Sequence, residues 1–187
     1  HVENSPGYHQ FVSMLFSDIL QTFGNAIDAP FRSRLQQKLA KAAHFMAWVV
    51  RPDGRLPPVG DTECKPASNV YRSLAGSVEY SHVDWVCSKG QSGVRPAGWS
   101  TLFPESGYFI SRSDWESADI VGDAFHLVFR CGRLSDYHRH DDDLSLTLWW
   151  GSDWLLDGGA YSYAEGDPTR RYLRSKWGHN VVVFDEG

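Results

Sequence analysis

Two histidines, His138 and His140, lie one residue apart and are followed directly by the aspartates at 141–143. On an extended chain, residues two apart face the same side, so both imidazoles can reach one cleft. Imidazoles transfer protons and bind metals near neutral pH. Three adjacent carboxylates cannot all face inward, so we expect most of them in a solvated turn, with one free to orient a histidine.

Asp157 is the next candidate, and it has two interpretations. It precedes two glycines, and Asp-Gly is a strong signal for a hairpin turn. Together with His140 and His179, however, it would complete a set of two nitrogens and one carboxylate oxygen, which suits Zn²⁺. Ligands so far apart in sequence fit neighbouring strands, and spacing alone leaves both interpretations open.

Tyr8 and His9 lie in the run ENSPGYH, just ahead of the first predicted helix. The Ser5-Pro6 pair in this run is typical of a helix start. The Tyr-His pair could also face a cleft between a helical part and a β part. By itself this motif does not decide between the two interpretations.

Two helices must position this N-terminal motif. Apolar residues at helical spacing predict a first helix from His9 to Phe23, ended by Gly24-Asn25. A second helix is predicted from about Pro30 to Val50, and it stops at the breaker residues 51–54. Two antiparallel helices joined by a short turn form an αα-hairpin, the repeat unit of helical toroids and solenoids.

The rest of the chain is predicted to be mainly β structure. Residues 53–105 are rich in Gly, Pro and Ser and predict a connection dominated by loops, with short helices around 68–80. Short polar turns between the following strand candidates are typical of an antiparallel sheet or sandwich. We therefore expect an α+β chain of two domains, residues 1–100 and 101–187. The strand candidates are Gly107–Arg112, Phe125–Cys131, Leu144–Trp150, Trp154–Leu156 and Val181–Phe184.

Composition narrows the class of partner. The net charge of −5 over 187 residues argues against nucleic acid as the main partner. No apolar run approaches the roughly 18 residues that a membrane span needs. Three widely spaced cysteines predict free thiols. Aromatic residues make up 14% of the chain, with eight Trp, and favour a carbohydrate ligand. The sequence does not begin with Met, and its last residues directly follow an apolar run. We therefore expect a fragment of a longer protein.

Five segments together resemble the heparinase II/III family of polysaccharide lyases, in the family's order and over nearly the whole chain. The resemblance implies the end of an α/α toroid in residues 1–100 and the start of an antiparallel β-sandwich in residues 101–187. The segments are ENSPGYH at 3–9, GRLPPVGDTE at 54–63, FPESGYFISRS at 103–113, YHRHDDDLSLTLWWGSDWLLDGGAYSY at 137–163 and RRYLRSKWGHNVVVFD at 170–185.

The resemblance implies β-elimination on a uronic-acid-containing polysaccharide, such as heparan sulfate or heparin, alginate, or a bacterial exopolysaccharide. By motif, Tyr8 and His138 match the family's catalytic tyrosine and histidine. A second tyrosine acts as acid or base in some relatives, and Tyr163 is the candidate here, with Tyr161 in reserve. Tyrosine has an ordinary pKa near ~10, so it becomes a useful base only beside positive charge or strong donors.

The resemblance also implies a metal and a location. His140, Asp157 and His179 match zinc ligands, where the metal shapes the site rather than performing the elimination. Family habit implies a periplasmic or secreted bacterial enzyme. The family usually neutralises the uronate with an Asn or an Asn-His pair on an earlier toroid helix, and no such segment lies in this chain. The candidate substrate-binding residues are Glu3, His9, Arg171 and Arg174.

Two other functions fit part of the pattern. A metal-dependent hydrolase of the metallo-β-lactamase type would carry His-x-His-x-Asp-His, but Asp143 stands at the last position, and the expected alternation of helices and strands is absent. A non-catalytic carbohydrate-binding or structural β domain could keep the zinc site without the lyase residues. Tyr8 distinguishes this binding domain from the lyase, because a binding module has no need of a phenol in the cleft.

Overall fold

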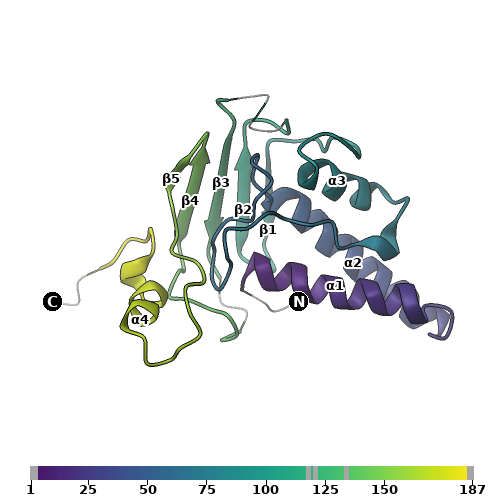
Figure 1. Cartoon of the computed structure of the whole chain (residues 1–187), viewed down its shortest axis with the longest axis horizontal. Coiled ribbons are helices and arrows are strands. Elements are labelled where there is room, and N and C mark those ends of the chain that lie inside the picture. Colours follow the sequence, from purple (N-terminus) through teal and green to yellow (C-terminus); the bar gives the residue numbers. More distant parts are fainter. Residues whose placement is uncertain (1–3, 117–118, 120–121, 133–134, 185–187) are drawn as a thin grey trace.

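In the computed structural model, which describes residues 4–116, 119, 122–132 and 135–184, an αα-hairpin opens the chain (Figure 1). Helix α1 spans Pro6–Phe23 and α2 spans Ala29–Val49. Each has a proline in its first turn and a side chain capping its start. The Ser5 hydroxyl accepts from the Tyr8 N–H, and the Asp28 carboxylate accepts from the Phe31 N–H. Both predicted helices are confirmed, with α1 beginning slightly earlier than expected.

The connection after α2 contains more helix than expected. A short 3-10 turn, η1 (Arg72–Leu74), leads into α3 (Val78–Cys87), which continues beyond the predicted short helices around 68–80. The Ser77 hydroxyl caps α3 by accepting from the Tyr80 N–H. Within the described residues, no helix is long and apolar enough to cross a bilayer. The three cysteines are free thiols, as predicted.

In the described residues, a five-stranded antiparallel sheet follows, with its strands in chain order from β1 to β5. Four of the five strands lie where the sequence predicts them, and the α+β class is confirmed. The strands are β1 (Ser100–Phe103), β2 (Tyr108–Arg112), β3 (Phe125–Arg130), β4 (Ser145–Trp150) and β5 (Asp153–Leu155).

Four elements near the sheet differ from the prediction. Strand β1 falls in the expected loop segment, since its four residues give too short a pattern to detect. The predicted strand Val181–Phe184 is wrong, because those residues have no strand ladder. The Asn180 side chain instead ties the segment to the Leu146 carbonyl. Helix α4 (Pro168–Arg174) and the 3-10 turn η2 (Lys176–Gly178) were not predicted.

The two faces of the sheet have different surroundings. On one face, Tyr108, Ile110 and Val128 join buried residues of α2 and α3 in one hydrophobic cluster. Figure 1 shows α1, α2 and α3 on this side, with α4 and the C-terminal segment on the other. The cluster is continuous from helices to sheet, and the division into domains at residue 100 remains a prediction. The opposite face carries apolar side chains that are only half-buried, namely Leu127, Phe129, Leu146 and Leu148.

Candidate functional site

One short loop, residues 57–62, brings the predicted site segments together. On the side of α1, the Thr62 hydroxyl lies 2.7 Å from the Ser5 hydroxyl. On the side of the segment after β5, the Thr62 carbonyl accepts from the Ala160 N–H at 3.1 Å. Between them, the Asp61 N–H donates to the carbonyl of His138 at 3.4 Å. The loop therefore connects three parts of the chain that are far apart in sequence.

Gly60 makes this close approach sterically allowed. Its φ is +55°, and a Cβ atom there would lie 2.6 Å from the Asn4 carbonyl oxygen and 2.9 Å from the His138 carbonyl oxygen. Any other residue would clash with backbone from both sides, and L residues seldom adopt this φ. The glycine in the run PPVGDTE is thus required by the meeting of the segments.

The structure brings Tyr8, His138 and Tyr163 together. The Tyr8 ring, on α1, stacks on the imidazole of His138 with 3.4 Å between ring centroids and 16° between planes. The hydroxyls of Tyr8 and Tyr163 lie 2.9 Å apart. Burial and the hydrogen bond with Tyr8 raise the pKa of Tyr163. Tyr161, the reserve candidate, and Tyr163 are both exposed, so the contact with Tyr8 is what favours Tyr163. Two phenols and one imidazole, from three separate segments, form a set able to transfer protons.

Asp61 is a site residue that the sequence analysis missed. Its Oδ2 lies 3.3 Å from His138 Nδ1, and its Oδ1 lies 2.9 Å from His140 Nε2. Burial raises the pKa of Asp61, but the hydrogen bonds from both histidines and the charges of His140 and Arg170 outweigh it, so the pKa is below its usual value. The carboxylate facing the histidines is therefore Asp61.

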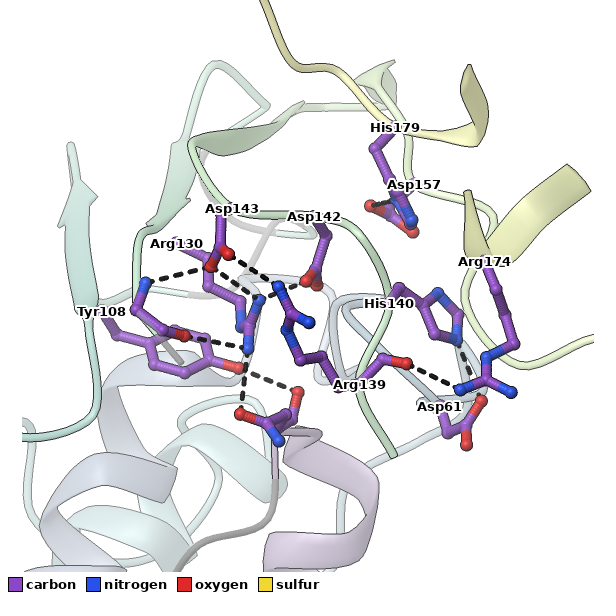
Figure 2. A network of polar contacts seen from close by, with 12 residues as sticks. Asp61, Tyr108, Arg130, Arg139, His140, Asp142, Asp143, Asp157, Arg174 and His179 are labelled. Atoms are coloured by element: carbon purple, nitrogen blue, oxygen red, sulfur yellow. Dashed lines mark hydrogen bonds and ion pairs between the residues drawn. The ribbon is translucent and has the colours of Figure 1, made fainter. Parts of the chain in front are cut away.

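His140, Asp157 and His179 form a cluster that could hold a metal ion. One ligand atom from each lies within 4.8 Å of the others. His179 Nδ1 lies 2.7 Å from Asp157 Oδ2, and Figure 2 shows these two side chains pointing toward each other above His140. His140 Nδ1 and His179 Nε2 are buried and have no hydrogen-bond partner among the residues that the structure describes. Such atoms are rare in folded proteins, and a bound cation would satisfy both.

The turn interpretation of Asp157 also holds in part. Its Oδ1 accepts from the N–H of Gly159 at 3.1 Å, which is a local turn contact. The carboxylate is nevertheless buried, and its other oxygen faces His179. Burial lowers the pKa of His179, but the hydrogen bond and charge of Asp157 raise it more, so the net pKa is raised.

A buried ion pair beside this cluster ties the helical part to the β part (Figure 2). Arg130 on β3 forms an ion pair with Asp142, and their side chains are 2% and 1% exposed. The same guanidinium donates to Asn4 Oδ1 at 3.0 Å. Asn4 in turn donates to the carbonyl of Tyr137 at 2.8 Å. Asn4 lies just before α1, which carries Tyr8, and Tyr137 directly precedes His138. One network of hydrogen bonds therefore holds both segments that meet in the contact between Tyr8 and His138.

One of the three aspartates at 141–143 turns inward, as the sequence analysis allows, but this residue, Asp142, pairs with Arg130 and not with a histidine. Asp142 is fully buried, and burial raises its pKa although Arg130 opposes this. Asp143 is partly exposed and bonds to Arg139 at 2.9 Å. The run of three aspartates does not indicate which carboxylate is buried, because its partner, Arg130, lies on strand β3.

The predicted substrate-binding residues lie in different places. Glu3 falls outside the described residues. His9 bonds to the Ala42 carbonyl at 3.0 Å among the helices, and burial lowers its pKa to about 4. Arg171 is exposed on α4. Arg174 donates to the carbonyl of Arg139 at 3.0 Å, beside the loop that carries the two histidines.

Arg170, which was not chosen from the sequence, lies over the ring of Tyr163. Its guanidinium carbon lies 5.0 Å from the centre of the Tyr163 ring. It also donates to the Ser162 carbonyl and lies 3.9 Å from Asp61 Oδ1. The sequence has four basic residues close together, but only the turn of α4 decides which of them faces the site; they are Arg170, Arg171, Arg174 and Lys176.

Comparison with known proteins gives a family for the second half of the chain. Residues 95–187 match the family described as Heparinase II/III-like, C-terminal. Residues 95–187 of this chain belong to the heparinase II/III-like family. A search of curated proteins gave no match.

Two solved structures share the fold of this heparinase II/III-like chain. Heparinase III, the BT4657 gene product, is 22% identical with a TM-score of 0.78, over 96% of this chain and 29% of its own. The heparan sulfate lyase HepC from Pedobacter heparinus is 20% identical with a TM-score of 0.69, over 93% of this chain and 27% of its own. The chain therefore spans less than a third of either structure.

Proposed function

We propose that this chain forms part of the active site of a lyase that cleaves a uronic-acid-containing polysaccharide by β-elimination. The observation that carries the proposal is the meeting of Tyr8, His138 and Tyr163, with two hydroxyls 2.9 Å apart and an imidazole stacked on one phenol. The two similar structures are described as a heparinase III and a heparan sulfate lyase, which supports an acidic polysaccharide as the partner.

The chemistry needs a base, an acid and a positive charge. A base removes the proton from C5 of the uronate, the electrons form a C4–C5 double bond, and the C4–O4 bond breaks. An acid then returns a proton to the leaving oxygen. We assign both proton transfers to the set of Tyr8, His138 and Tyr163, because its members are within reach of one sugar.

Arg170 is our candidate for the positive charge. A proton next to an ionised carboxylate is very weakly acidic, so the carboxylate must be neutralised and the developing charge stabilised. The Arg170 guanidinium lies over the Tyr163 ring, where it can meet a carboxylate or sulfate. Arg174 and the exposed Arg171 are candidates for contacts farther along the polymer.

We further propose that His140, Asp157 and His179 hold Zn²⁺. Two imidazole nitrogens and a carboxylate suit this ion, and the two buried nitrogens that lack a partner among the described residues favour it. When bound, the ion would link the loop between β3 and β4 to the segments after β5 and after α4. The ion therefore shapes the site, and no proton transfer passes through it.

The wider fold and location are part of the same proposal. We propose that residues 1–100 end an α/α toroid and that residues 101–187 begin a β-sandwich. Exposed apolar residues along α1, among them Phe11, Leu15 and Phe23, support packing against further helices. The half-buried apolar face of the sheet supports a second sheet. A periplasmic or secreted location is proposed from the family resemblance alone.

The test is the Tyr8→Phe variant of the protein that carries this chain. Ultraviolet absorbance of the unsaturated product is followed on heparan sulfate, heparin, alginate and bacterial exopolysaccharides. We expect kcat to fall about 100- to 10,000-fold, because the variant lacks one proton-transfer group. Tyr137→Phe is the control, since Tyr137 is adjacent to His138 in sequence and is exposed.

Two outcomes would refute the lyase proposal. One is a Tyr8→Phe variant as active as the wild type, which would remove the phenol from the reaction. The other is a wild-type protein that binds these polymers but releases no unsaturated product. That second outcome would favour the alternative, a carbohydrate-binding β domain with a metal site.

A further inference from the structure

Asp61 is placed to control two histidines at once. Its two carboxylate oxygens bond to different rings, Oδ2 with His138 at 3.3 Å and Oδ1 with His140 at 2.9 Å. The residue is 6% exposed, so little water competes for these oxygens. In such surroundings, a hydrogen bond to an ionised carboxylate is stronger than a hydrogen bond between two uncharged groups.

The contact with His140 settles which nitrogen of that ring faces the candidate metal cluster. Because Nε2 lies against a carboxylate oxygen, it carries the hydrogen and donates. Nδ1 then keeps its lone pair, and within the described part of the chain this buried atom has no hydrogen-bond partner. An outer carboxylate that fixes the tautomer and direction of a metal-binding imidazole is a general feature of metal sites.

The contact with His138 holds a residue in an uncommon backbone conformation. His138 has a φ of +52°, in the left-handed region that residues other than glycine seldom adopt. Asp61 contacts it twice, since its N–H donates to the His138 carbonyl and its carboxylate meets the His138 ring. Such conformations persist where surrounding contacts determine them, and here the ring must lie against Tyr8.

The loop that carries Asp61 is itself held from two sides. Thr62 bonds to Ser5 at the start of α1, and the Thr62 carbonyl accepts from the Ala160 N–H. The Asp61 carboxylate therefore has a fixed position from which to orient both rings. The contacts that hold this loop come from the helical part and from the segment that follows β5.

We infer that Asp61 is a positioning residue that fixes His138 against Tyr8 and His140 toward the metal cluster, coupling the two halves of the site. The part that concerns His138 rests on the proposed lyase function. The part that concerns His140 does not, because it can be measured as zinc binding alone.

The test is the near-isosteric Asp61→Asn variant. Its amide keeps one acceptor oxygen, but the NH₂ group cannot accept from the second imidazole. Zinc affinity is measured by competition with a chromogenic chelator, and kcat and KM are measured by product absorbance. We expect zinc affinity to fall about 10- to 100-fold and kcat by a similar factor, as for other outer-shell carboxylates, with KM changed less than about twofold.

Asp53→Asn is the matched control, because Asp53 lies in the loop after α2 and pairs with Arg51. It should keep both zinc affinity and kcat. Far-ultraviolet circular dichroism verifies folding, and Asp61→Ser takes the place of Asp61→Asn where the latter does not fold.

The outcomes separate the two proposals. Unchanged zinc affinity in a folded Asp61 variant would overturn the inference for His140, and unchanged kcat would overturn it for His138. A loss of zinc affinity in a protein whose wild type forms no unsaturated product would support positioning of His140 and refute the lyase function.

Discussion

A buried histidine under α2 should make the stability of this protein strongly dependent on pH. His126, on β3, is 2% exposed, and its Nε2 lies 2.9 Å from the carbonyl of Trp48 in the last turn of α2. Burial and the nearby charge of Arg112 lower its pKa, and the bond to Trp48 offsets this only in part. The charge of Arg51 lowers the pKa of His126 further, and the resulting pKa is about 3.

The sign and size of the effect follow from this pKa. The folded protein keeps His126 neutral, whereas the unfolded chain protonates it below its ordinary pKa of 6.5. Its contribution to stability is therefore complete above pH 6.5 and is lost as the pH falls toward 3. At pH 5 the loss is 1.36 × (6.5 − 5.0), or roughly 2 kcal/mol. That is a large part of the ~5–15 kcal/mol that stabilises a typical domain.

The assay is urea unfolding of the wild type and the His126→Gln variant at pH 7.5 and pH 5.0, with chelator present. The glutamine amide can donate to the Trp48 carbonyl but does not titrate. We therefore expect the free-energy cost of the substitution to shrink by about 2 kcal/mol between the two pH values. His82→Gln is the control, because His82 is only partly buried and should show a smaller change.

A cost that stays constant within about 0.5 kcal/mol would refute this reasoning. It would mean that His126 takes up its proton equally readily in the folded and unfolded protein. The ring would then be accessible to water, contrary to its position between the sheet and α2.

Three further outcomes are expected from other parts of the fold. Arg130→Met should lower the free energy of unfolding by about 3–5 kcal/mol, because it leaves Asp142 buried and unpaired, whereas Arg95→Met, at an exposed pair, should cost less than about 1 kcal/mol. Equal costs in urea unfolding would contradict this. Gly60→Ala should destabilise by more than about 1 kcal/mol in the same assay, since its Cβ would meet backbone on both sides. Zinc should raise the melting temperature of the wild type but not of His179→Ala, and an equal rise in both would place the ion elsewhere.

Local sequence patterns were sufficient for most of the secondary structure. The spacing of apolar residues predicts α1 and α2 because each helix has an apolar side that packs on neighbours. Alternating patterns predict β2, β3 and β4 for the same reason, whereas β5 has only three residues, all of them exposed. Strand β1 has too few residues for a pattern. The apolar run 181–184 resembles a strand, but side-chain bonds from Asn180 hold it instead.

The sequence by itself also determined the kinds of chemistry present, because residue type decides whether a group can transfer a proton or bind a metal. It could not determine which of several similar groups take part. Asp61, Asp142 and Arg170 each lie among like residues in the sequence, and each owes its place to partners on distant segments. Only the tertiary structure brings those segments into contact, and burial among them gives each charge its environment.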